Sequence, residues 1–416
     1  MIENLHSISK VFETVSPANR PRISPAFLLL STFFFSMAVF CYFPYITTSF
    51  ADYISVDPID IASMLAIGTF FGNVVALAIS VLANINKTRF VSALFFVMCC
   101  VSIVTPLVLK SLSNGILLFV VAISVFFYRL SIAMIFNFIR FIQLEYIQNS
   151  ESKLKLFTNT KLFFGLGSAS GPIVGYLSLG TAGIVGAAAV SVVLTCISAA
   201  LVLYTKPISR NNNFEELSVI RFSFTGIFKD KVALLSYISG FFYVMLESQI
   251  YSYISLTIKK NFSGYESSIS LFFIINAVSL IIALPLFSMV SDRIQNRRIL
   301  LLPAAMCSLA AVIFIPNINS DFGVIVIALL ITIGEAVVPQ LLLDYATRSH
   351  TVHQNRNSIA LFNFFTSGLG MGAGIWFGGI AVTYFSPTQA SVFWILFFVA
   401  YVISIYFTER FEVRAR

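Results

Sequence analysis

The sequence predicts an all-α membrane protein with twelve transmembrane helices in two pseudo-symmetric six-helix bundles. Hydrophobic residues make up 58% of the 416 residues, charged residues only 11%, and the mean hydropathy is +0.91, which excludes a soluble globular protein. Twelve apolar runs approach the roughly 20 residues needed to cross a ~30 Å hydrocarbon core. A glycine pattern in the fifth run, Gly165 to Gly175, recurs 203 positions later as Gly368 to Gly378. A glycine-ribbed span that occurs twice, half a chain apart, predicts two homologous halves.

The apolar runs divide six and six, with polar connectors between them. The predicted spans are 26–48, 60–83, 91–110, 115–138, 157–178 and 183–204, followed by 232–258, 266–290, 299–316, 322–345, 358–381 and 390–408. This predicts an N-terminal tail (1–25), a first bundle (26–204), a linker (205–231), a second bundle (232–408) and a C-terminal tail (409–416). No loop is long enough for a soluble catalytic domain, so we expect the function to reside within the bilayer.

The net charge of +8 is explained by topology. With the N-terminus in the cytoplasm, 22 of the 26 Lys and Arg residues fall on the cytoplasmic side of the predicted spans. Only Lys110, Lys259 and Lys260 fall outside, and Arg129 lies within a span. The positive-inside rule therefore predicts that both termini are cytoplasmic, and the charge is not an indication of nucleic-acid binding.

The chain carries no signature of catalysis or metal binding. The five cysteines lie in apolar runs without ligand spacing and are interpreted as small buried hydrophobes. There is no phosphate-binding loop, no metal-binding HExxH motif and no nucleophile elbow. The 25 mostly polar N-terminal residues do not form a cleavable signal, so the first span is expected to act as an uncleaved signal-anchor. We expect a protein that is not an enzyme and has no cofactor.

The fifth run contains Gly167, Gly171, Pro172 and Gly175. Glycines four residues apart share a helix face and admit a neighbouring backbone, and the proline weakens the helix. The pattern indicates either tight packing alone or a hinge or sealing surface between the halves. It resembles the antiporter motif of the drug–proton antiporter branch of the major facilitator superfamily, although Tyr176 replaces the second glycine of that motif's terminal pair.

A short basic segment between the eighth and ninth spans carries Asp292, Arg293, Arg297 and Arg298. It resembles the signature cytoplasmic loop of the same superfamily. A carboxylate there is expected to meet the positive end of a helix dipole, which contributes about 0.3–1 kcal/mol, and to latch one conformation. The alternative is an ordinary solvated loop charge.

Ionisable side chains at membrane depth are costly and mark functional sites. Three such side chains stand out as candidates: Arg129, Glu247 and Glu335. Arg129 and Glu335 are at similar depth in the fourth and tenth spans, which are repeat partners, so we expect them to face one another as a gate or proton-sensitive pair. The alternatives are an inert buried ion pair, or an arginine that extends towards lipid headgroups.

Aromatic and amide side chains within spans are candidates for a substrate cavity. In the first span, Tyr42-Phe43-Pro44-Tyr45 is similar to a pattern of drug antiporters; these aromatics either line a cavity or form an interfacial belt. The other candidates are amides that either bind substrate or join helices. The candidate cavity residues are Tyr42, Tyr45, Asn137, Gln249, Asn276 and Asn363.

The resemblance to bacterial multidrug-resistance members implies a secondary active transporter of the inner membrane. It implies proton-coupled efflux of a small lipophilic or amphipathic compound (drug, antibiotic, bioactive peptide or siderophore) by alternating access. The proton gradient is the energy source, Glu335 and Glu247 are the coupling candidates, and the expected partners are substrate, protons and lipid, with a monomeric chain. The alternatives are a nutrient uptake symporter or facilitator, or a membrane sensor or scaffold.

Overall fold

The computed structural model describes residues 25–82, 88–112, 114–145, 150–204, 230–291, 294, 298–347 and 352–415. These residues form helices joined by short turns, with no strand among them, which confirms the predicted all-α fold class. The first half comprises α2 (Pro25–Tyr42), η2 (Phe43–Tyr45), η3 (Ile46–Phe50), α3 (Ala51–Ile54), α4 (Pro58–Leu82), α5 (Thr88–Val108), α6 (Asn114–Glu145) and α7 (Ser150–Tyr204). The second comprises α9 (Lys231–Glu247), η6 (Ser248–Tyr251), α10 (Tyr253–Asn261), α11 (Tyr265–Ser291), α12 (Arg298–Phe314), η7 (Ile315–Asn317), α13 (Asp321–Thr347), α14 (Val352–Asn363), η8 (Phe364–Gly370), α15 (Met371–Tyr384) and α16 (Pro387–Ala415).

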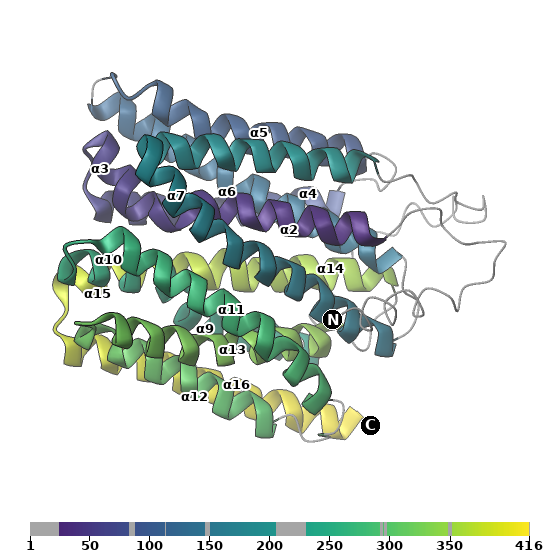
Figure 1. The fold of residues 1–416 in the computed structure, drawn as a ribbon. Helices are drawn as coiled ribbons and strands as arrows, with labels where there is room; N and C mark the ends of the chain where they lie inside the picture. Colours follow the sequence, from purple (N-terminus) through teal and green to yellow (C-terminus); the bar gives the residue numbers. More distant parts are fainter. Residues whose placement is uncertain are drawn as a thin grey trace.

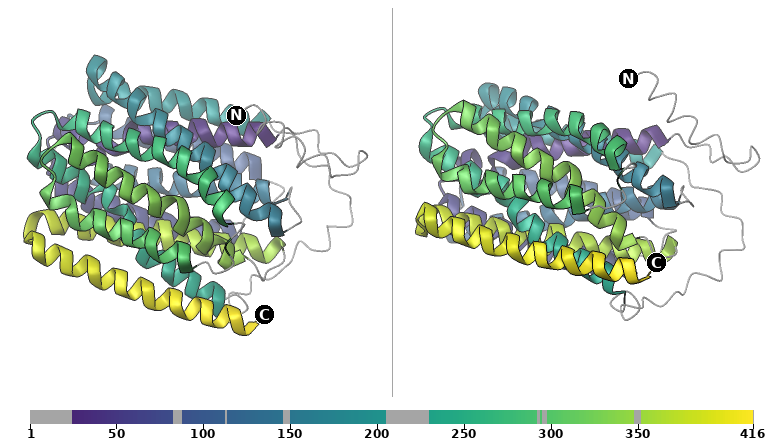
Figure 2. Two further views of the ribbon diagram at one scale, coloured as in Figure 1. Left: turned by 60° about the horizontal axis from the view of Figure 1, so that its bottom comes forward. Right: turned by 90° about the horizontal axis from the view of Figure 1, so that it is seen from below.

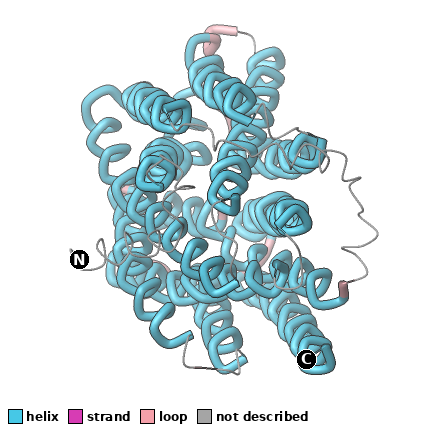
Figure 3. Tube along the Cα trace, turned by 90° about the vertical axis from the view of Figure 1, so that its right-hand side faces the viewer, coloured by secondary structure: helices cyan, strands magenta, loops and turns pink. Residues whose placement is uncertain are grey.

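The helices run roughly along one common direction, in two groups that follow the halves of the sequence (Figure 1). The same long helices are seen from two further sides in Figure 2 and from one end of the bundle in Figure 3. The described chain begins with α2 and finishes with α16 at one end of the bundle, which we call the terminal end. The opposite end, where α3 and α10 lie, is called the α3 end.

Ten segments of the described residues are long and apolar enough to cross a membrane. One of them, Asn159–Tyr204, spans 46 residues and contains a break, because Ala182 and Gly183 leave helical geometry. Gly183 has φ +61° and ψ −157°, which glycine adopts without the strain of a Cβ. The break falls at the start of the predicted sixth span, 183–204. The run predicted at 232–258 is divided into α9, η6 and α10 and is not one of the ten, so the count of twelve stays a prediction.

The two halves repeat the same glycine-mediated helix contact. A Cβ on Gly171 of α7 would lie 2.8 Å from the carbonyl oxygen of Met37 on α2. A Cβ on Gly374 of α15 would lie 2.8 Å from the carbonyl oxygen of Met245 on α9. Real Cβ atoms do not approach this closely, so both glycines are needed for the backbones to touch. The repeat seen in the sequence is therefore a repeat of contacts.

The glycines that face α2 are Gly167, Gly171 and Gly175. Their partner belongs to the same half, so they pack a single bundle rather than seal the two halves together. Contact with the other half begins two residues earlier, where Gly165 meets the Leu280 side chain of α11. The repeat partner of Gly165, Gly368 of η8, lies against the Asn73 side chain of α4.

The outer surface is apolar. Phe119, Leu177 and Ile282 are 65%, 63% and 59% exposed, far more than a water-facing surface of contiguous helices carries. The cysteines correct one sequence-based interpretation: Cys41 and Cys99 are buried, but Cys196 is exposed on this apolar surface. Among the residues described, no group of three His, Cys, Asp or Glu side chains is placed to hold a metal.

Candidate functional site

A central cavity of about 200 Å³ lies between the two halves. The first half contributes wall residues from α2, η2, α4, α6 and α7, and the second half from α9, η6, α13, α14, η8 and α15. The wall combines aromatic and aliphatic side chains with a few polar and charged groups, the usual composition of a small-molecule site. Its charged residues are Arg129, Lys161, Glu247 and Glu335.

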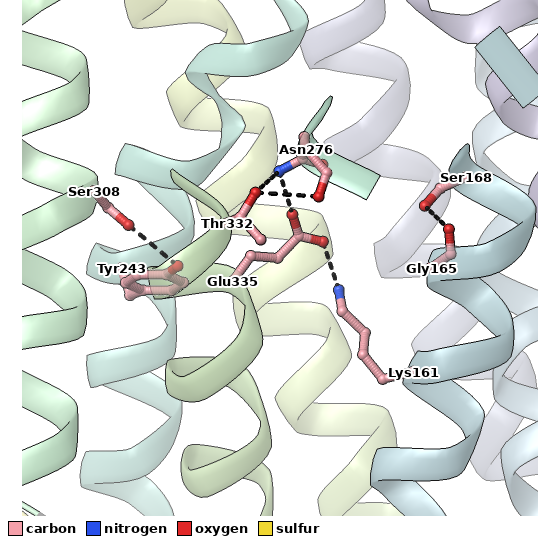
Figure 4. A network of polar contacts seen from close by, with 8 residues as sticks. All are labelled: Lys161, Gly165, Ser168, Tyr243, Asn276, Ser308, Thr332 and Glu335. Atoms are coloured by element: carbon pink, nitrogen blue, oxygen red, sulfur yellow. Dashed lines mark hydrogen bonds and ion pairs between the residues drawn. The ribbon is translucent and has the colours of Figure 1, made fainter. Parts of the chain in front are cut away.

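Glu335 of α13 forms an ion pair with Lys161 of α7. Lys161 Nζ lies 2.7 Å from Glu335 Oε1, and the two side chains are 16% and 8% exposed. The other carboxylate oxygen, Oε2, accepts a hydrogen bond of 3.2 Å from Asn276 Nδ2, which also lies 3.0 Å from Thr332 Oγ1. Figure 4 shows Lys161 extending from its helix to this carboxylate. The pair joins the two halves of the chain at the cavity wall.

Close packing fixes the position of Glu335. Its neighbour Gly334 lies so near α12 and α9 that a Cβ would overlap Ser308 Oγ and approach the Tyr243 hydroxyl to 2.7 Å. The Tyr243 hydroxyl itself lies 3.4 Å from Ser308 Oγ (Figure 4). Any larger residue at 334 would push α13 away from these helices and displace the carboxylate.

Glu247 is the second carboxylate of the cavity. It is the last residue of α9, directly before the 3₁₀ turn of η6 interrupts the helix. Its Oε2 atom is buried and has no hydrogen-bond partner among the described residues. A carboxylate oxygen held at a cavity without a donor is placed to take a proton or a cationic group.

Arg129 of α6 does not pair with Glu335, which corrects the sequence-based expectation. Its guanidinium donates to the Met371 sulfur at 2.7 Å and lies 5.2 Å from the centre of the Phe43 ring. Glu335 is held by Lys161 instead. Repeat symmetry gave Arg129 and Glu335 similar depth, but depth alone does not decide which side chains face each other.

Of the residues predicted to bind substrate, two line the cavity. These are Asn137 and Asn363, and they contact each other across the halves, with Asn363 Nδ2 donating to Asn137 Oδ1. Gln249 is buried and donates to the carbonyls of Met245 and Gly374, so it joins α9 to α15. Tyr42, Tyr45, Gln249 and Asn276 are not part of the cavity wall.

At the α3 end, beyond the cavity, polar contacts hold the halves together. Lys259 Nζ of α10 lies 2.7 Å from Asp52 Oδ1 of α3, and the Tyr265 hydroxyl donates to Asp52 Oδ2 at 2.9 Å. The Tyr45 hydroxyl donates to the Pro172 carbonyl at 3.2 Å and lies 2.7 Å from Ser270 Oγ of α11. The structure therefore represents a conformer that is closed at the α3 end.

The predicted loop motif cannot be placed. Asp292, Arg293 and Arg297 lie outside the described residues, and of Arg298 only its position at the start of α12 is described. The latch expected for this segment stays a prediction.

Sequence reasoning missed Lys161 and the helix breaks at the cavity. Lys161 stands near the start of the fifth apolar run and was assigned with the cytoplasmic basic residues. Lys161 precedes Phe164 by three residues, a spacing that puts both on one helix face, and this was the signal available in the sequence. In the structure Lys161 Nζ lies 4.8 Å from the centre of the Phe164 ring. The break at η2 contains Pro44, which was visible in the sequence, whereas nothing in Ser248–Tyr251 predicts η6.

Comparison with known proteins identifies the family. A family model described as the Major Facilitator Superfamily matches residues 160–375, which is more than half of the chain. The chain belongs to the Major Facilitator Superfamily. It is therefore a membrane transporter of that fold, which is not a class of enzyme. No curated protein matches the chain.

Solved structures of this superfamily share the fold at low sequence identity. The nucleoside transporter NupG matches with a TM-score of 0.60 at 15% identity, covering 92% of this chain and 98% of its own. The human organic anion transporter MFSD10 matches with a TM-score of 0.64 at 14% identity, covering 93% of this chain and 100% of its own. A POT family transporter in complex with 5-aminolevulinic acid matches with a TM-score of 0.70 at 12% identity, covering 94% of this chain and 97% of its own. At such identities the similarity establishes the fold alone.

Proposed function

We propose that this transporter couples the movement of protons to the export of a small lipophilic or amphipathic compound by alternating access. The observation that carries the proposal is the Lys161–Glu335 ion pair, since it joins the two halves at the wall of the central cavity. Alternating access requires the halves to move relative to each other around such a cavity.

Protonation supplies the link between chemistry and movement. A proton on Glu335 removes the carboxylate charge and weakens its contact with Lys161, so separation of α7 from α13 becomes less costly. Because a hydrogen bond to a charged group contributes about 1.5–3 kcal/mol, loss of this one is enough to shift a two-state equilibrium more than tenfold. Glu247, whose Oε2 has no partner in the described part of the chain, is the second proton acceptor of the cavity.

Broken helices give the cavity wall its adaptability. The first helix of each half is interrupted beside the cavity, at η2 and η3 in one half and at η6 in the other. Discontinuous helices at the midplane are a common way in which transporters build a substrate site. We assign the closed α3 end to the outer side of the bacterial inner membrane, with both termini cytoplasmic and the chain a monomer.

Transport in oriented vesicles tests the function and its direction. The exporter proposed here loads a labelled substrate into energised inside-out vesicles, and a protonophore abolishes the loading. Loading of right-side-out vesicles alone would instead show uptake, and loading of neither would show a sensor or scaffold. Single cysteines at Asn212 and Ser263 test the topology: an impermeant thiol reagent applied to intact cells should label only the second.

A further inference from the structure

Arg129 is a buried cation in the cavity wall without a carboxylate partner. Its side chain belongs to a residue that is 5% exposed, yet it takes part in neither of the two ion pairs found in the described part of the chain. Its Nε atom has no hydrogen-bond partner among the same residues. Its one hydrogen-bond acceptor there is the Met371 sulfur.

The contacts of the Arg129 guanidinium do not satisfy its hydrogen-bond donors or its charge. A guanidinium presents five N–H donors in a planar fork that matches a carboxylate, whereas a thioether sulfur is a weak acceptor. Burial of a cation without an anion is costly, and the Phe43 ring at 5.2 Å compensates only part of that cost. The missing partner is therefore an anion that enters through the cavity.

The two cavity carboxylates do not supply this anion. Both oxygens of Glu335 are occupied, one by Lys161 and the other by Asn276. Glu247 lies in the same cavity but forms no ion pair with Arg129.

The Phe43 ring that faces the guanidinium belongs to a group of aromatic rings in the cavity wall. Phe43 packs edge-on against Tyr251 at 4.8 Å between ring centres, and both line the cavity. Phe40, also in the wall, lies 6.5 Å from Tyr251. A ligand whose acid group reaches Arg129 places its neighbouring carbon atoms against these rings.

We propose that Arg129 binds the carboxylate of the transported compound, and that the substrate is an organic acid with an aromatic or apolar body. This inference rests on the proposed function, because the bound acid is the transported compound only if the protein is an exporter. The acid binds with its carboxylate in the fork of Arg129 and its body between Phe43, Tyr251 and Phe40.

Binding of a matched pair of fluorescent probes tests the proposal. The full chain is purified in detergent, and the fluorescence anisotropy of 1-naphthylacetate is compared with that of the uncharged 1-naphthylacetamide. The acid is expected to bind at least about tenfold more tightly than the amide, as a hydrogen-bonded charge pair predicts. Arg129→Gln removes this preference without weakening amide binding, and Arg129→Lys, which keeps the charge but not the fork, restores part of it.

The control variant is Lys110→Gln, which removes an exposed cation outside the cavity wall and is expected to keep the full preference for the acid. Thermal unfolding of each variant shows that it is folded. Equal binding of acid and amide, absence of acid binding to the folded wild-type chain, or a preference that survives Arg129→Gln would overturn the proposal. Because binding is measured without a proton gradient, a failure of proton coupling leaves this result unaffected.

Discussion

Lys161 Nζ lies 2.7 Å from Glu335 Oε1, so one ion pair connects α7 of the first half to α13 of the second. Asn276 of α11 holds the other carboxylate oxygen, at 3.2 Å. The same carboxylate therefore belongs to the cavity wall and to the contact between halves, which lets one proton act on both.

The change Glu335→Gln tests this double role. The amide has no charge to attract Lys161, so we expect the contact between halves to weaken by about 1.5–3 kcal/mol and proton-driven transport to be lost. Lys161→Met should weaken the same contact, and the double variant should cost less than the two single effects combined. Transport in energised vesicles and thermal unfolding measure the two effects, and additive losses would contradict direct coupling.

Glu247→Gln is expected to separate substrate movement from proton movement. The uncharged side chain cannot exchange a proton, so gradient-driven accumulation stops, while exchange of labelled for unlabelled substrate across the membrane continues. Asp60→Asn is the matched control, because Asp60 is an exposed acid in the first turn of α4 that does not line the cavity. Accumulation at the wild-type level in Glu247→Gln would remove Glu247 from the coupling mechanism.

Gly171→Ala should destabilise the first half. Its new Cβ meets the carbonyl oxygen of Met37 and the Phe40 side chain, both 2.8 Å away, and such overpacking costs about 1–3 kcal/mol. Gly180→Ala in the same helix is the control, since no atom lies within 4 Å of its Cβ position. There the substitution should be neutral or stabilise by about 0.5–1 kcal/mol. Thermal unfolding in detergent ranks the two, and the opposite order would show that α2 and α7 do not pack as described.

Asp52→Asn should favour opening at the α3 end with little effect on stability. The Asp52 side chain is 52% exposed, so its pair with Lys259 contributes at most about 1 kcal/mol and is screened by salt. The distance between spin labels at Val56 and Ser263 should lengthen in a larger share of molecules. High salt should have a similar effect on the wild-type chain, and an unchanged distribution in both cases would show that the pair does not hold this end closed.

Much of the fold was predictable because hydrophobicity and glycine spacing record it directly. Helices that touch through their backbones need a glycine at each close approach. The repeated glycines Gly171 and Gly374 therefore predicted from the sequence the contacts that the structure shows. The predicted sixth run also begins at the break, at Gly183.

The site was harder to predict because partners depend on helix rotation. The sequence identified Arg129, Glu247 and Glu335, and all three line the cavity. It could not show that Glu335 meets Lys161. The positive-inside rule counts a lysine near the end of a span as cytoplasmic, whether its side chain faces lipid headgroups or a cavity. Nor could it separate Asn137, which lines the cavity, from Gln249, which joins two helices.

Protonation of Glu335 is proposed to open the α3 end of the bundle and to close the terminal end. Electron–electron distance measurements in nanodiscs test it with two label pairs, Val56 with Ser263 at the α3 end and Tyr204 with Arg410 at the terminal end. Glu335→Gln, which has no charge at position 335, as a protonated carboxyl would have none, should lengthen the first distance and shorten the second relative to the wild-type chain. Distances that are the same in the two proteins at both ends, or that lengthen together, would contradict the account.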